Sequence, residues 1–233
     1  MTEVVAPLPR RESWTKAGPV VSHMDETEIT ALEERTTATS ADPSPLGLWA
    51  LATGTWILGT VFGGAFPSSA FMGTVPALLV FAGIAQFIAG LFAYRRTNVL
   101  WATAFCSFGA LYVATSLFFI MSANLGFPNG SDATILQGFF LESFAFIALA
   151  LAIAALPTNL AVFSVFACLT VGYALTGIPF LKGNYDAAGW TIIRDIGGWF
   201  LVAAGFFAYY TGMAVVVNSI WNRTVMPLGG EAH

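Results

Sequence analysis

The sequence predicts an all-α integral membrane protein, a six-transmembrane-helix bundle preceded by a disordered polar N-terminal tail. Of its 233 residues, 57% are hydrophobic and only 9% are charged, whereas soluble domains carry about 25% charged residues. From Leu46 onward, apolar blocks of about 20 residues, the length that spans a hydrocarbon core, follow one another. The alternation over about ten residues that marks membrane-spanning strands is absent.

The apolar blocks divide the chain into three parts. Residues 1–41 are polar, rich in Thr and Glu, and predicted to be a disordered tail. A transmembrane domain is expected over 42–226, followed by a short C-terminal tail, 227–233. Its six spans are expected at about 46–66, 70–94, 99–122, 135–156, 160–181 and 191–221, separated by short connections rich in Pro, Gly, Asn and Arg. Short connections predict that consecutive helices are neighbours.

Basic residues indicate the orientation. Arg95 and Arg96 lie in the second connection and Arg223 follows the last span, while the first and third connections contain no Lys or Arg. The positive-inside rule therefore places both termini in the cytoplasm. The expected location is a plasma membrane or a bacterial inner membrane.

The stretch Asp42-Pro43-Ser44-Pro45 precedes the first span directly. An Asp side chain can accept backbone N–H bonds at the start of a helix. Pro45 suits the first helical turn, where no intrahelical N–H bond is lost. We therefore expect a rigid cap at the mouth of the first helix.

Small residues recur at the spacing that lets helices approach closely. Gly59 and Gly63 form a GxxxG pair, and Ala85 and Ala89 have the same spacing. The pattern predicts a tight bundle, with contacts within one chain favoured and contacts between subunits as the alternative.

Polar residues within the spans are few, so each is a candidate site. Glu142 lies about 10 Å inside the fourth span and Arg194 about 5 Å inside the sixth, counted from the same side. They are expected either to form a structural ion pair or to line a polar vestibule for a small anion. Gln86, in the second span, is expected to face a pore or a neighbouring helix, and Asn98 is a further polar candidate.

The sequence lacks the residues that several classes of membrane-protein chemistry require. Histidine occurs only at His23 and His233, so no histidine relay crosses the membrane, as an ammonium channel with paired pore histidines would require. There is no phosphate loop, no metal-ligand cluster and no second carboxylate within the membrane that could form a catalytic pair, and an enzyme would need such a constellation. We expect no enzymatic activity, metal or cofactor, and no basic cluster suggests nucleic acid. Cys106 and Cys168 are expected to act as small hydrophobes.

Four motifs follow one another along the chain: DPSPLGL from Asp42, GIAQFIAGLFAYRRTN from Gly83, AFCSFGALY from Ala104 and NRTVMPLG from Asn222. These ordered motifs resemble those of the acetate uptake transporter family, the succinate–acetate permeases. DPSPLGL is similar to the family's NPAPLGL, and GIAQFIAGLFAYRRTN is similar to GIAQxxAGLxEYxxGN. AFCSFGALY resembles AFxSYGxFW, and NRTVMPLG resembles GRTVLPIG. The register holds from about Asp42 to Gly229, and the first motif assigns Asp42, Pro43, Pro45 and Gly47 to a signature cap.

The resemblance implies a six-helix protomer with its own central path, assembled as a homohexamer, that moves acetate and similar small carboxylates. The family's apolar constriction, a Phe, a Tyr and a Leu, falls on Leu51, Phe108 and Leu169 in this chain. Only the leucine is retained, so the neck is expected to differ in width and polarity.

An apolar neck offers no hydrogen bonds to a carboxylate, and a bare charge would cross it only at a cost of several kcal/mol. We therefore expect the substrate to cross protonated or with a proton, as a channel or a symporter. A channel for small neutral solutes such as urea or short amides is one alternative. A membrane receptor or scaffold whose acidic tail binds a cytosolic partner is another.

Overall fold

The computed structural model describes residues 27, 41–125, 130–183 and 189–230. The chain divides into two units, Met1–Ala41 and Asp42–His233, and the second is the membrane unit described below. Except for Thr27 and Ala41, the predicted tail 1–41 lies outside the described residues, as do 231–233.

Six helical segments in the described part of the chain are long and apolar enough to cross a membrane. Five are continuous helices: α3 (Ser44–Phe62), α6 (Val99–Leu125), α7 (Ser131–Ala155), α8 (Leu160–Phe180) and α9 (Thr191–Trp221). The second span, Ser69–Arg95, is composite. The predicted number and order of spans are confirmed, and most bounds differ by only a few residues. The fourth helix starts at Ser131 rather than near 135, because its first turn is polar and apolar patterning misses it.

The second span changes helical type along its length. A 3₁₀ segment, η2 (Ser68–Thr74), and a short helix, α4 (Val75–Ala77), lead into a π-helix, η3 (Leu78–Ala85), which continues as α5 (Gln86–Arg95). Pro76 stands at the start of α4, where its missing N–H removes no helical bond. π-Helical turns are rare and occur mostly at functional sites, and Gln86 follows this one directly.

Helices α3 and α9 pack in antiparallel directions through glycines. A Cβ built on Gly59 would lie 2.7 Å from the Gly198 carbonyl oxygen, and one on Gly198 would collide with the backbone at Gly63. Further along, Gly205 lies against Trp56 and Gly212 against Trp49. The GxxxG pair of α3, Gly59 and Gly63, therefore packs against α9 of the same chain.

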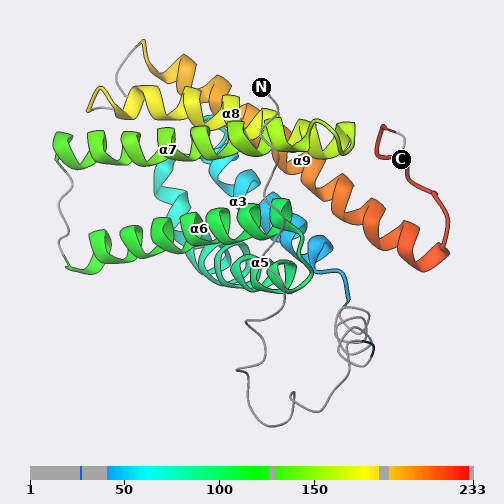
Figure 1. Cartoon of the computed structure of the whole chain (residues 1–233). Helices are drawn as coiled ribbons and strands as arrows, with labels where there is room; N and C mark the ends of the chain where they lie inside the picture. The colour runs from blue at the N-terminus through cyan, green and yellow to red at the C-terminus, as the bar shows by residue number, and fades with distance from the viewer. Residues whose placement is uncertain (1–26, 28–40, 126–129, 184–188, 231–233) are drawn as a thin grey trace, which may run out of the picture. The chain divides into compact units, whose positions relative to one another are not determined.

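The other helices surround this pair. Helix α8 packs against α9 and α7, while η3 and α5 pack against α3 and α6. Consecutive helices are neighbours, as predicted, with one exception. Helices α6 and α7 run apart in Figure 1 and meet mainly through side chains, including the rings of Phe108 and Phe144 with centroids 5.6 Å apart. Large aromatic side chains and a cavity separate these two backbones.

The bundle has two ends, which we name from what lies there. At the tail end, where α3 begins and α9 ends, Asp42, Arg96 and Asn98 line one small pocket. At the opposite end, the cavity end, where α3 and α8 end, Phe62, Phe180 and Arg194 line one large cavity. Helices α3, α6 and α8 therefore all run from the tail end to the cavity end.

The last described segment folds back onto the tail end. The Asn218 side chain accepts hydrogen bonds from the backbone N–H groups of Val225 and Met226 and donates one to the Met226 carbonyl. The carbonyl of Gly229 then accepts the N–H of Leu160, at the start of α8. The motif NRTVMPLG therefore ties the end of the chain to α8.

Candidate functional site

The residues assigned to the signature cap lie at the start of α3. The Asp42 carboxylate accepts the backbone N–H of Ser44 at 2.9 Å. Pro43 stands at the N-cap and Pro45 lies in the first turn of α3. Gly47 is covered by the Phe105 ring, which occupies the space a Cβ would need. The cap is therefore a packed junction between α3 and α6.

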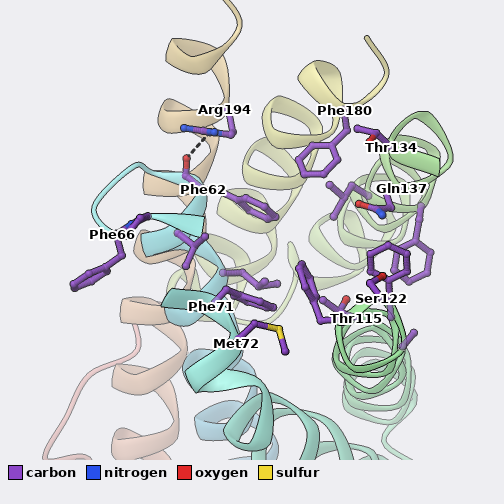
Figure 2. Close-up of a pocket in the computed structure, with 18 of the residues that line it drawn as sticks. Phe62, Phe66, Phe71, Met72, Thr115, Ser122, Thr134, Gln137, Phe180 and Arg194 are labelled. Carbon is purple, nitrogen blue, oxygen red and sulfur yellow. Dashed lines mark hydrogen bonds between the residues drawn. The ribbon is translucent and has the colours of Figure 1, made fainter. Parts of the chain in front are cut away.

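A cavity of about 910 Å³ opens at the cavity end. Its lining residues come from α3, η2, α6, α7, α8 and α9 and from the loop between α3 and η2, and Figure 2 shows most of the labelled side chains facing one another, while Phe66 points away. The cavity thus lies within one chain, between the spans and beside the separation of α6 and α7. Its volume far exceeds that of a small carboxylic acid, so the cavity can hold such a solute with water.

The cavity lining is mainly apolar, with polar groups on two helices. Thr115 and Ser122 come from α6, and Thr134 and Gln137 from α7. The Ser122 hydroxyl is buried without a hydrogen-bond partner among the described residues. Arg194 carries the one charge among the described lining residues. The cavity is therefore a mainly apolar vestibule whose few polar groups can attract a small anion and form hydrogen bonds with it.

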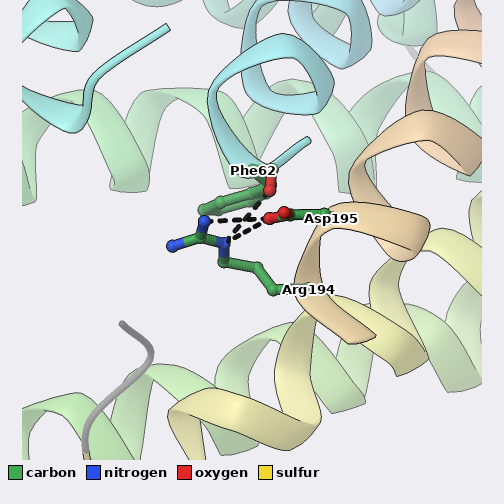
Figure 3. A network of polar contacts seen from close by, with 3 residues as sticks. All are labelled: Phe62, Arg194 and Asp195. Carbon is green, nitrogen blue, oxygen red and sulfur yellow. Dashed lines mark hydrogen bonds and ion pairs between the residues drawn. The ribbon is translucent and has the colours of Figure 1, made fainter. Parts of the chain in front are cut away.

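Arg194 is anchored at the edge of this cavity (Figure 3). Its Nε donates to the Phe62 carbonyl oxygen at 3.1 Å, and its guanidinium pairs with Asp195 at 2.9 Å. The Arg194 side chain is 13% exposed and the Asp195 side chain 38%. Arg194 therefore stabilises the carbonyl of the last residue of α3 while placing positive charge at the cavity.

The predicted ion pair between Glu142 and Arg194 is absent from the described contacts. Arg194 binds Asp195, its neighbour in sequence, and the end of α3 instead. Glu142 Oε1 lies against Gly177 of α8, buried and without a hydrogen-bond partner among the described residues. The prediction was wrong because depth along two helices says nothing about the direction in which their side chains point. Glu142 therefore faces α8 within the bundle and does not line the large cavity.

Gln86 and Asn98, the remaining polar candidates, lie elsewhere. Gln86 is fully buried, so it avoids lipid as predicted, and its amide has no hydrogen-bond partner among the described residues. Asn98 lies at the tail end, where its side chain accepts the Trp101 N–H at 3.2 Å at the start of α6. The four polar candidates therefore do not form one site: only Arg194 lines the large cavity.

The predicted neck residues lie inside the bundle. Leu51, Phe108 and Leu169 are each 0% exposed and belong to one contiguous core, so none of them faces the lipid. The Phe108 ring stacks on Tyr173, with centroids 6.0 Å apart. The large cavity does not reach these three residues, so any path through them is closed in this conformation, and their role as a neck stays a prediction.

Sequence reasoning missed two buried tyrosines next to these residues. Tyr112 and Tyr173 are fully buried, and neither hydroxyl has a hydrogen-bond partner among the described residues. A signal was available, because each stands four residues after a predicted neck position, Phe108 and Leu169, and thus on the same helix face.

Comparison with known proteins identifies the family. A family model described as GPR1/FUN34/yaaH matches residues 26–229. The succinate-acetate/proton symporter SatP of Escherichia coli K12 is 32% identical over 194 residues, which cover 83% of this chain and 97% of SatP. Acetate permease A of Emericella nidulans is 25% identical over 195 residues, covering 81% of this chain and 65% of the permease.

A solved structure, that of the bacterial acetate channel SatP, matches with a TM-score of 0.71 and 29% identity, and covers 82% of this chain and 100% of that one. The resemblance found in the sequence motifs is confirmed, as is the six-helix fold. The chain therefore belongs to the GPR1/FUN34/yaaH family and, like the members just described, is a multi-pass membrane protein.

Proposed function

We propose that this chain is a membrane channel or transporter for acetate and other small carboxylates, with succinate among those to test. The observation that carries the proposal is the match to SatP, named a succinate-acetate/proton symporter, which extends over all six spans. The large cavity supports it, because it offers a small acid an apolar chamber with one anchored cation, Arg194.

The proposed route leads from the cavity through the neck of Leu51, Phe108 and Leu169 to the tail end. All three side chains are apolar and fully buried, so a passing carboxylate would lose its hydration there without gaining hydrogen bonds. An ionised carboxylate in such surroundings costs several kcal/mol or more, and the neutral acid far less. The substrate is therefore expected to cross the neck as the neutral acid, which makes transport proton-linked.

Reconstituted protein tests both parts of this proposal. The full chain is placed in liposomes, and uptake of labelled acetate is measured between pH 5 and pH 8 with an internal pH indicator. A simple carboxylic acid has a pKa of about 4, so lowering the pH from 7 to 5 raises its neutral fraction roughly a hundredfold. Uptake at low acetate concentration should rise in the same direction and acidify the lumen.

Two outcomes would count against the proposal. Acetate uptake no faster than in empty liposomes would overturn the carboxylate assignment, and osmotic shrinkage with urea in the same preparation would then favour the neutral-solute alternative. Acetate uptake that does not change between pH 5 and pH 8 would leave a carboxylate carrier but remove the proton link.

The orientation and assembly belong to the same proposal. Arg96 lies at the tail end with Asp42, and Arg223 directly follows α9, so both termini are proposed to be cytoplasmic. A homohexamer is proposed from the family resemblance. Labelling of single cysteines placed at each end in sealed cells, and the mass of the purified complex in detergent, test these two points separately.

A further inference from the structure

Two tyrosines in the core have hydroxyl groups that are buried without a hydrogen-bond partner. Tyr112 of α6 and Tyr173 of α8 are both 0% exposed, and their hydroxyl groups have no hydrogen-bond partner among the described residues. Buried polar groups are nearly always hydrogen-bonded, and those that are not call for an explanation. An apolar Phe would fill either site without leaving a donor or acceptor unsatisfied.

Ser116 and Ser122 on α6 also have buried hydroxyl groups without a hydrogen-bond partner among the described residues, but a buried threonine and two other tyrosines of the bundle do not share this property. Thr55, fully buried on α3, bonds back to the carbonyls of Leu51 and Ala52 at 3.0 Å. Tyr209 pairs with the Thr53 hydroxyl at 2.8 Å, and Tyr210 donates to the Pro227 carbonyl at 2.6 Å. A hydroxyl group without a hydrogen-bond partner is therefore not a general property of the tyrosines: it distinguishes Tyr112 and Tyr173 from Tyr209 and Tyr210.

The two phenols are close together. The hydroxyl groups of Tyr112 and Tyr173 lie near each other, although farther apart than a hydrogen bond, and the Tyr173 ring stacks on Phe108 with centroids 6.0 Å apart. The Tyr112 ring covers Gly54 of α3, where any Cβ would collide with it. The phenols therefore come together where α3, α6 and α8 converge.

Their position along the bundle follows from the helix directions. Tyr112 lies four residues after Phe108, and Tyr173 four residues after Leu169, which is about one helical turn in each case. Because α6 and α8 run toward the cavity end, both phenols lie one turn from the predicted neck on the cavity side. Seven residues beyond Leu51 on α3, Leu58 already lines the cavity.

We propose that the hydroxyl groups of Tyr112 and Tyr173 form a binding station for the carboxyl group of the substrate, between the large cavity and the neck. This inference rests on the proposed transport of small carboxylates. A phenol both donates and accepts hydrogen bonds. Two of them can donate to both oxygens of a carboxylate, or one can donate to the carbonyl of a neutral acid while the other accepts its O–H.

The two phenols supply hydrogen-bonding groups, which the apolar neck lacks. The neck residues Leu51, Phe108 and Leu169 carry no hydroxyl group. A carboxyl group held one turn earlier would still exchange its water for protein hydrogen bonds before it meets the apolar side chains. Specificity for a carboxyl group over an apolar solute would then arise at this station.

Phenylalanine substitutions test the station, since they remove each hydroxyl group and keep the ring. Tyr112→Phe, Tyr173→Phe and the double variant are compared with Tyr209→Phe, whose hydroxyl pairs with Thr53 on another side of α3. In liposomes, each core variant should raise the KM for acetate about three- to tenfold, the effect of losing one hydrogen bond. Tyr209→Phe should leave the KM unchanged.

Thermal unfolding in detergent separates binding from stability. Because the two hydroxyl groups have no partner, their removal should leave the melting temperature unchanged or raise it. Acetate should raise the melting temperature of the wild type by mass action, and the increase should be smaller in the double variant. This readout needs no transport.

The outcomes distinguish this inference from the function on which it rests. A wild type that does not transport acetate would overturn the proposed function. A wild type that transports acetate, with a double variant of the same KM and the same acetate-induced thermal shift, would overturn the station alone. Lower melting temperatures with an unchanged KM would show that the phenols are structural.

Discussion

The closed neck leads to a prediction for Phe108→Ala. The Phe108 side chain is fully buried and pairs with two rings, Phe144 at 5.6 Å and Tyr173 at 6.0 Å between centroids. If Phe108 blocks the path, the ring must leave both partners each time a solute passes. Each ring pair is worth about 0.5–1.5 kcal/mol, so the swing costs about 1–3 kcal/mol.

Removing the ring removes this cost from the barrier. With about 1.4 kcal/mol for each factor of ten, uptake of acetate by Phe108→Ala in liposomes should rise roughly five- to a hundredfold. A wider acid such as benzoate should gain more than acetate, because the ring also limits width. The same truncation leaves a cavity and should cost about 3–5 kcal/mol of stability, so uptake is normalised to folded protein measured by size exclusion.

Phe105→Ala is the matched control for the loss of a buried ring. Phe105 is also fully buried on α6, but its ring stacks on Trp101, with centroids 5.1 Å apart, and covers Gly47. It should lose similar stability without a gain in rate. Equal or slower uptake by folded Phe108→Ala, or an equal gain in Phe105→Ala, would refute the reasoning that places the neck at Phe108.

Three further predictions concern the cap, the helix contact and the cation. Asp42→Ala removes the acceptor of the Ser44 N–H and should lower the stability in detergent by about 1 kcal/mol, while Asp42→Asn keeps an acceptor and should lose less. Gly198→Ala would drive a Cβ into the backbone of α3 and should lower the melting temperature by an amount equivalent to about 1–3 kcal/mol. An unchanged melting temperature would mean that α3 and α9 can move apart far enough to fit the added methyl group without loss of stability. Arg194→Gln removes the charge at the cavity and should raise the KM for acetate more at low than at high salt, whereas Arg194→Lys should retain most of the attraction; equal KM values for the wild type and Arg194→Gln would exclude a role in attracting the anion.

The number, order and approximate bounds of the spans could be read directly from the sequence. A bilayer demands about 20 apolar residues for each crossing, and Pro, Gly and charged residues interrupt such runs visibly. The cap at Asp42 was equally readable, because a side chain two residues from its N–H partner involves only local geometry. The family was readable because its motifs keep their order and spacing along the chain.

Side-chain direction across the bundle was decided only by the tertiary structure. The Glu142–Arg194 pair fails because Arg194 reaches the end of α3 and Glu142 turns toward Gly177. The π-helical course of η3 and the separation of α6 from α7 are also invisible in hydropathy, which counts apolar residues but does not record how helices rotate and pack. Tyr112 and Tyr173 lie on different helices, α6 and α8, so their proximity depends on how the whole bundle packs. The local sequence determines that each helix forms, but not which side chains of two separate helices meet.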